Sequence, residues 1–265
     1  MSLCTIPFRL IVFIATLWGI ATTAPLGLRD PAKKEIAMRL VSSAENSSLD
    51  WKSQYGYIEY NVEHVAAENR GYTGGIIGFT SRTGDMLEMV EYYRDLEPAN
   101  PLVAFLPALR AVNGSPSQAG LGRAFVRAWA AAATDAKFRE AQDHERDGVY
   151  FDPAVNQAMA DGLHELGQFI YYDAMVMHGP GDDPGSFGGI RDAAIRKARL
   201  PSDGGDESAY LEAFLDARVI AMQAEEAHGD TSRVDTMQRK FLREKNLRLT
   251  PPLVFKTYGD SYRID

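Results

Sequence analysis

The sequence predicts an α+β domain that is predominantly helical, with one small β element after the first helix. Apolar side chains recur at helical spacing through most of the last two-thirds of the chain. An aspartate followed by proline, a start signal for helices, occurs at residues 30–31 and again at 152–153. Residues 55–81 differ, because aromatic and β-branched side chains there alternate with clustered glycines. No internal repeat or long linker divides the chain, so we expect one α+β domain.

The first 24 residues form a separate unit with the composition of a secretory signal. Arg9 precedes the apolar run LIVFIATLWGIA, which gives way to the small residues ATTA. A short basic start, an apolar core too brief to cross a bilayer and a small-residue end are typical of a cleaved signal; the alternative is a membrane anchor. Cleavage is expected after Ala24, with Ala21 as the alternative, and residues 25–265 are expected to form a single domain. We therefore expect a secreted protein.

The elements follow in order along the mature chain. The first helix is predicted over residues 30–45, where apolar positions share one face and serine-rich sequence follows Glu45. Residues 55–81 predict short strands in a hairpin or irregular sheet, with 61–69 as a loop or a single helical turn. Further helices are predicted between glycine- and proline-rich breakers, over residues 83–96, 101–111, 120–145, 152–177, 186–199, 206–228 and 231–246.

Charge and cysteine content exclude several classes of protein. Removal of Arg9 with the signal leaves 27 basic residues against 36 acidic ones. This negative net charge argues against a nucleic acid or an anionic membrane as partner and permits attraction of a cationic ligand. Cys4 is the only cysteine, so the mature protein has no disulfide, and a chain of this length buries enough core without one.

Motifs for metal, cofactor and nucleophilic chemistry are absent from the sequence. The five histidines have no HExxH or similar paired spacing, and no phosphate loop or G-x-S-x-G elbow occurs. Carboxylates remain, and glycoside hydrolysis needs two of them. Glu45 at a helix C-terminus is well placed to stay protonated, and Glu68 precedes the predicted strands. From spacing alone the two could equally be surface acids among the 36 in the chain.

Longer strings resemble a known family. They are KKEIAMRLVSSAENSSLDWKSQYGYIE, RGYTGGIIGFTSRTGDMLE, VYFDPAVNQAMADGL, YYDAMVMHGPGDDPGSFGGIR, FLDAR, DTSRVDT and PPLVFKTYGDSYRI. Together they resemble the chitosanases of glycoside hydrolase family 46, from about Asp30 to the C-terminus. The resemblance implies a secreted enzyme with a two-lobed, lysozyme-like fold and a cleft between the lobes. It also implies internal hydrolysis of the β-1,4 linkages of chitosan with inversion, without a metal or cofactor.

The resemblance implies roles for residues in two of these strings. Glu45 matches the general acid. The general base of the family is an aspartate two residues before the arginine of RGYTGG, and this chain has Glu68 there, in a segment that is longer than usual. Glu63 is the alternative base. Thr73 matches a residue that holds the attacking water with the base, and Arg70 matches a residue that keeps the base ionised.

Further matches concern support of the acid and recognition of the substrate. Asp173, Arg218 and Arg233 match a buried charged cluster behind the general acid, with the structural role of joining the lobes as the alternative. The implied substrate contacts are Asp85 and Glu225, with Ser47, Tyr57 and His178 as weaker candidates. Acidic side chains suit the protonated amines of glucosamine. The family's second acid after the helix is replaced here by Gly229.

The sequence thus predicts an endo-acting, inverting chitosanase that binds chitosan, contacts neither nucleic acid nor membrane once processed, and is a monomer. Two rival functions stay open. One is hydrolysis of another polysaccharide, such as peptidoglycan or β-glucan, on the same scaffold. The other is a chitosan-binding protein weakened in catalysis by the change from aspartate to Glu68.

Overall fold

The computed structural model describes residues 1, 26–62, 64, 69–225 and 229–265. The predicted signal over residues 1–24 and both candidate bases, Glu63 and Glu68, lie outside these residues, apart from Met1. Among the helices described, none has the length and apolar character needed to span a bilayer.

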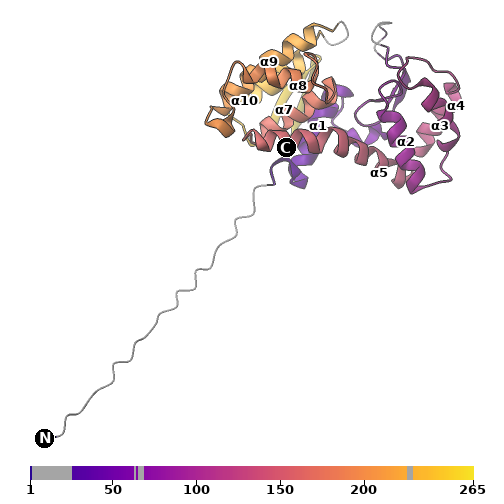
Figure 1. Ribbon diagram of the computed structural model, residues 1–265, viewed down its shortest axis with the longest axis horizontal. Helices are drawn as coiled ribbons and strands as arrows, with labels where there is room; N and C mark the ends of the chain where they lie inside the picture. Colours follow the sequence, from indigo (N-terminus) through magenta and orange to yellow (C-terminus); the bar gives the residue numbers. More distant parts are fainter. Residues whose placement is uncertain (2–25, 63, 65–68, 226–228) are drawn as a thin grey trace.

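The chain forms two lobes, seen side by side in Figure 1. One lobe carries α2 (Asp85–Leu96), α3 (Leu106–Val112), α4 (Gly122–Ala132) and α5 (Ala136–Glu145). The other carries α7 (Glu165–His178), α8 (Phe187–Ile195), α9 (Glu207–Gln223) and α10 (Arg239–Arg243). The π-helical turn η5 (Arg146–Phe151) and α6 (Asp152–Ala160) connect α5 to α7. The predicted class, α+β and predominantly α, is confirmed.

The first helix, α1 (Pro31–Glu45), begins and ends where the sequence predicts. The Asp30 carboxylate accepts hydrogen bonds from the amides of Ala32 and Lys33, and Pro31 occupies the first helical position. Its apolar face is buried, and the helix stops at Glu45. A short 3-10 helix, η1 (Gly27–Arg29), precedes it, and η2 (Trp51–Gly56) follows it.

The predicted small β element is a three-stranded antiparallel sheet. It consists of β1 (Ile58–Tyr60), β2 (Tyr72–Gly74) and β3 (Phe79–Thr80) in that order. In the centre of the sheet, Thr73 is paired with Glu59 on one side and with Thr80 on the other. The sheet therefore fixes the position of Thr73 from both sides.

Two of the predicted helices are broken in the structure. Residues 120–145 form α4 and α5, because Asp135 accepts a hydrogen bond from Lys137 N–H and starts a new helix. Residues 152–177 form α6 and α7, which are separated by a turn containing Gly162 at a φ of +81°. The predicted helix over 231–246 is a π-helical segment, η7 (Arg233–Gln238), that continues into α10. The short 3-10 helices η4 (Val103–Phe105) and η6 (Pro201–Asp203) complete the helical elements.

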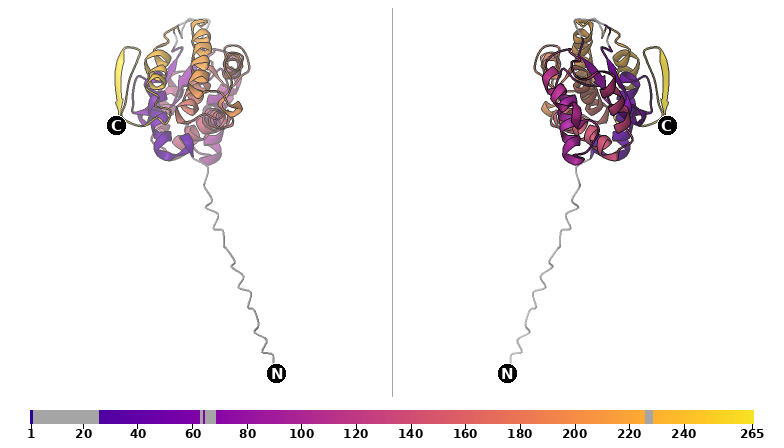
Figure 2. Two further views of the ribbon diagram at one scale, coloured as in Figure 1. Left: turned by 90° about the vertical axis from the view of Figure 1, so that its left-hand side faces the viewer. Right: turned by 90° about the vertical axis from the view of Figure 1, so that its right-hand side faces the viewer.

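A C-terminal hairpin was not predicted. Strands β4 (Leu253–Thr257) and β5 (Asp260–Ile264) pair antiparallel around the turn at Tyr258-Gly259. Buried and exposed residues alternate along β4, which is the pattern of a strand with one covered face. Figure 2 shows this hairpin at the outer side of its lobe. The turn nevertheless returns Tyr258 to the cleft described below.

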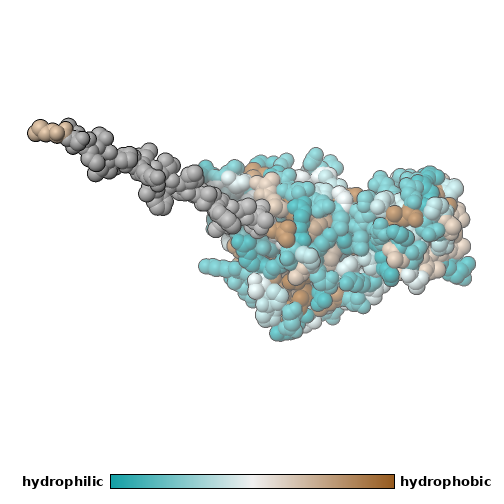
Figure 3. Space-filling model, turned by 90° about the horizontal axis from the view of Figure 1, so that it is seen from below, coloured by the Kyte–Doolittle hydropathy of each residue, from teal (hydrophilic) through white to brown (hydrophobic). Residues whose placement is uncertain are grey.

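The face of the molecule in Figure 3 is largely hydrophilic, with hydrophobic residues in small scattered groups. The core lies inside the lobes. In one lobe Phe125, Trp129 and Phe138 pack edge to face, and in the other Tyr171 packs against Phe187 and Phe214.

Candidate active site

Two adjoining cavities form one cleft. The cavity at the end of α1 has a volume of about 420 Å³ and is called the near cavity; the other, of about 370 Å³, is called the far cavity. The two share part of their lining, which consists of Arg70, Ile77, Gly78, Thr80, Val176 and Met177. A continuous cleft suits an extended ligand better than a compact one.

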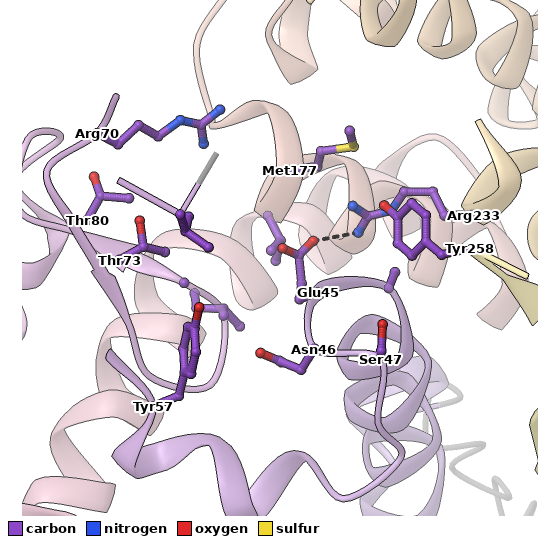
Figure 4. Close-up of a pocket in the computed structure, with 15 residues that line it drawn as sticks. Glu45, Asn46, Ser47, Tyr57, Arg70, Thr73, Thr80, Met177, Arg233 and Tyr258 are labelled. Carbon is purple, nitrogen blue, oxygen red and sulfur yellow. Dashed lines mark hydrogen bonds and ion pairs between the residues drawn. The ribbon is translucent and has the colours of Figure 1, made fainter. Parts of the chain in front are cut away.

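Glu45 lies in the near cavity at the C-terminal end of α1. Its side chain is 25% exposed, and Oε1 accepts a hydrogen bond of 2.7 Å from Nη2 of Arg233. Figure 4 shows this ion pair beside the ring of Tyr258, with the carboxyl group directed into the cavity. Within the described part of the chain, no hydrogen bond to Oε2 of Glu45 is found. One oxygen is therefore fixed while the other faces the space that a ligand would fill.

A buried charged network lies behind Glu45. Asp173 is fully buried and accepts hydrogen bonds from Arg233 and Arg218, at 2.7 Å and 2.6 Å. Burial alone would raise the pKa of Asp173, but the two guanidinium groups outweigh it and lower the pKa to about 2. Gln238, from η7, donates to Asp173 and accepts from Arg218. The predicted cluster is thus one hydrogen-bonded unit that positions Arg233, and through it Glu45.

The opposite wall of the near cavity comes from the sheet. Thr73 and Arg70 lie there, across from Glu45 (Figure 4). The hydroxyl of Thr73 is buried and has no hydrogen-bond partner among the described residues, so it can bond to a molecule inside the cavity. Tyr57 also lines this cavity and donates a hydrogen bond of 3.0 Å to Glu59.

The far cavity holds the predicted acidic contacts. Asp85, Glu225 and His178 all line it. Nη2 of Arg70 lies 4.0 Å from Oε2 of Glu225. Nε2 of His178 accepts a hydrogen bond of 3.4 Å from Nε of Arg218. Asp85 accepts four hydrogen bonds, from the amides of Thr80 and Met86 and from the hydroxyls of Thr83 and Tyr150.

The structure brings the predicted residues together with few exceptions. Glu45, Ser47, Tyr57, Arg70, Thr73 and Arg233 line the near cavity, and Asp85, His178 and Glu225 line the far one. Asp173 and Arg218 lie behind the wall and are fully buried. The base, whether Glu68 or Glu63, falls outside the described residues; Arg70, two positions after Glu68 in the sequence, lies on the wall that carries Thr73.

Several side chains of the cleft were missed by the sequence analysis. They are Tyr258 in the near cavity, Glu88, Glu145 and Tyr150 in the far cavity, and Gln238 in the buried network. For Tyr258, the alternating pattern of residues 253–264 around a Tyr-Gly turn could have indicated the hairpin. For the others no local signal exists, because their positions depend on the packing of α2 against α5 and of α7 against η7.

In residues 26–62, 64, 69–225 and 229–265, no group of three or more histidine, cysteine, aspartate or glutamate side chains could hold a metal ion. The polar side chains of the cleft are mainly carboxyls, hydroxyls and guanidinium groups, with the amide of Asn46 and the imidazole of His178. A carboxyl fixed through one oxygen, facing a wall with an unpartnered hydroxyl, is an arrangement for proton transfer to a bound ligand.

A long polar cleft between two helical lobes, with a glutamic acid at a helix end, is the layout of a glycoside hydrolase. Comparisons with known proteins agree. The model of glycosyl hydrolase family 46 matches residues 39–253. A chitosanase of Streptomyces sp. (strain N174) is 64% identical over 253 residues, covering 96% of this chain and 89% of that protein. The chain belongs to glycosyl hydrolase family 46.

Solved structures show the same fold. The structure of chitosanase OU01 with substrate has a TM-score of 0.87 and 57% identity to this chain, covering 91% of this chain and 100% of that one. The complex of a chitosanase from Gynuella sunshinyii with chitotetraose has a TM-score of 0.79 and 34% identity, covering 88% and 97% of the two chains.

Proposed function

We propose that the protein is a secreted endo-chitosanase that hydrolyses β-1,4 linkages between glucosamine units with inversion of the anomeric centre. Family membership and the named chitosanases support chitosan as the substrate. The observation that carries the mechanism is the placement of Glu45 and Thr73 on facing walls of one cavity. The acidic lining of the far cavity suits a polycation.

In this mechanism Glu45 protonates the glycosidic oxygen. Arg233 holds Oε1, so that Oε2 is directed at the leaving group. A bound sugar chain covers the exposed quarter of the Glu45 side chain and so excludes bulk water from the proton transfer. The network of Asp173, Arg218 and Arg233 fixes the carboxyl group without contacting the substrate.

Water attacks from the opposite wall. We assign Glu68 as the base that takes the proton of this water, with Glu63 as the alternative. Thr73 orients the water through its unpartnered hydroxyl. An inverting enzyme needs its two carboxyls about 6.5–9.5 Å apart, which leaves room for that water. Arg70, on the same wall, stabilises the ionised base. Asp85 and Glu225 contact amines, and Ser47, Tyr57 and His178 line the sugar path.

The test is hydrolysis of three polymers by the purified protein. We expect new reducing ends from chitosan, and few or none from peptidoglycan or β-glucan. Viscosity should fall faster than reducing ends appear, because cleavage is internal. Proton NMR of the first product should show the α-anomer. Preferential release from peptidoglycan or β-glucan would contradict the substrate; binding to chitosan without release would show a carbohydrate-binding protein; a β-anomer would contradict inversion.

Export of the protein is tested by a separate measurement. The mass of the protein recovered from the medium should correspond to a chain that begins at Pro25, or at Thr22 if cleavage follows Ala21. Retention of the whole chain in the membrane fraction would show an anchor instead.

A further inference from the structure

The far cavity contains a pair of carboxyl groups that the proposed mechanism does not use. Glu145 is the last residue of α5, and Glu88 lies on α2, which packs against α5. Both line the far cavity. Glu145 is only 7% exposed, and its buried Oε1 has no hydrogen-bond partner in the part of the chain that the structure describes. A buried acceptor without a donor is costly unless a ligand supplies one.

The surroundings of Glu145 are acidic. Burial and the charges of Glu88 and Asp85 raise the pKa of Glu145 to about 7. Tyr150 also lines the far cavity. Burial and the charge of Asp85 raise the pKa of the Tyr150 hydroxyl as well.

The charged groups on the other packed elements are engaged elsewhere. Arg146, next in the chain, donates to Asp143 and Asp147. Nη2 of Arg70, which precedes β2 in the chain, lies 4.0 Å from Oε2 of Glu225. The remaining titratable side chains nearby are His144, which stacks on Tyr92, and His178, which accepts from Arg218. No ion pair between a basic residue and Glu145 or Glu88 occurs among the described residues.

Most hydrogen-bond acceptor positions of Asp85 are already occupied by protein donors. Three of its hydrogen bonds converge on Oδ1, and Oδ2 accepts from Tyr150. A carboxylate has about four acceptor positions, so most of the capacity of Asp85 holds the turn before α2 and the Tyr150 side chain in place. The free acceptors of the far cavity therefore belong to Glu145 and Glu88.

We propose that Glu145 and Glu88 form an amine-binding pair that takes the ammonium group of a glucosamine unit at the far end of the cleft. An ammonium group has three N–H donors, and it can bond to Glu145, to Glu88 and to the remaining position on Oδ2 of Asp85. In the empty cleft Glu145 holds a proton at mildly acidic pH, and the ammonium group replaces it. The proton leaves to solvent, so two carboxylates then face one cation.

This inference rests on chitosan being the ligand, and its test separates the two claims. Glu145→Gln keeps the shape of the side chain and removes its charge. We expect the KM for a glucosamine hexamer to rise about tenfold, as for loss of a charge-assisted hydrogen bond, while kcat stays within about twofold. Glu88→Gln should act in the same direction. Glu140→Gln is the matched control, because Glu140 is on the same helix, is exposed and pairs with Lys137.

A second measurement detects the exchanged proton. Calorimetry of hexamer binding at pH 6 to the Glu45→Gln protein, in buffers of different ionisation enthalpy, measures binding without hydrolysis and should show release of about one proton, because the pKa of Glu145 is about 7. Adding Glu145→Gln to this protein should abolish the release, and the single Glu145→Gln protein should melt no lower than wild type at pH 6, because the amide keeps the shape of the neutral acid.

Two results would overturn the assignment. One is a KM of the Glu145→Gln protein that matches the Glu140→Gln control. The other is unchanged proton release. If wild type does not cleave chitosan, the proposed function fails, and proton release on binding still decides the role of the pair.

Discussion

The two cavities of the cleft differ in whether their carboxyl groups are paired with arginine. At the near cavity and in the buried network behind it, Glu45 and Asp173 are paired with Arg233 and Arg218, and each guanidinium donates to at least one carboxylate. In the far cavity, Glu145 faces Glu88 and Asp85. The near cavity balances its charges from within the protein, whereas the far cavity carries an excess of acid.

This difference separates chemistry from recognition. A proton donor must hold one geometry, and buried ion pairs with arginine provide it, since breaking such a pair leaves an uncompensated charge. A recognition site for a cation must instead lack an internal partner, so that the ligand becomes the partner. We therefore expect substitutions in the near cavity to reduce kcat or stability, and substitutions in the far cavity to raise KM.

The largest effect is expected for Glu45→Gln. Loss of the general acid should lower kcat on chitosan oligomers by about 10²–10⁴-fold, while KM changes little because the shape is kept. The measurement is steady-state kinetics on a glucosamine hexamer. Glu35→Gln is the control, because it lies on the same helix and pairs with Arg39 at 3.0 Å outside the cleft. A kcat close to wild type would exclude Glu45 as the acid.

Asp173→Asn tests the network behind the acid. It leaves Arg218 and Arg233 buried without their shared anion, and we expect a loss of about 3–5 kcal/mol in the free energy of unfolding, measured in urea. Asp216→Asn, on the exposed pair with Arg239, should cost less than about 1 kcal/mol. Equal costs at the two sites would show that the network contributes no more than a surface pair.

The same network predicts that the folded protein loses stability at low pH. The pKa of Asp173 is lowered from its usual 3.8 to about 2 in the folded protein. Its contribution to stability is therefore complete above about pH 4 and is lost as pH falls toward 2. Wild-type unfolding free energy should drop across that window, and the Asp173→Asn protein should lack this part of the drop.

A smaller effect is expected for Thr73→Val. Because the Thr73 hydroxyl has no partner among the described residues, its removal should not lower stability, yet kcat should fall about 10–100-fold through loss of an oriented water. Its strand neighbour Thr80 is the contrast, since that hydroxyl bonds to Thr83 at 2.6 Å. Thr80→Val should lower the unfolding free energy by about 1 kcal/mol. The opposite pattern would give Thr73 a structural role only.

The sequence predicts the near cavity better than the far one. Glu45 could be placed because local signals, the Asp30 cap and the serine-rich end, fix both ends of α1. Thr73 and Arg70 could be placed because a glycine-rich aromatic segment predicts strands. Roles for these residues came from resemblance to the family and not from the pattern itself.

Glu145 could not be singled out from the sequence. It is one acid among several at a helix end, and its burial arises only when α2 packs against α5. The helix breaks before α5 and before α7 were also missed, because a single cap at Asp135 and a turn at Gly162 interrupt an otherwise continuous apolar pattern. The C-terminal hairpin was missed although its alternation was visible, and with it Tyr258.

The most direct test of the account compares Glu45→Gln and Glu145→Gln in one steady-state experiment on a glucosamine hexamer. The account predicts that the first loses kcat at nearly constant KM, and that the second raises KM at nearly constant kcat. A loss of kcat in the Glu145→Gln protein with little change in the Glu45→Gln protein would contradict it.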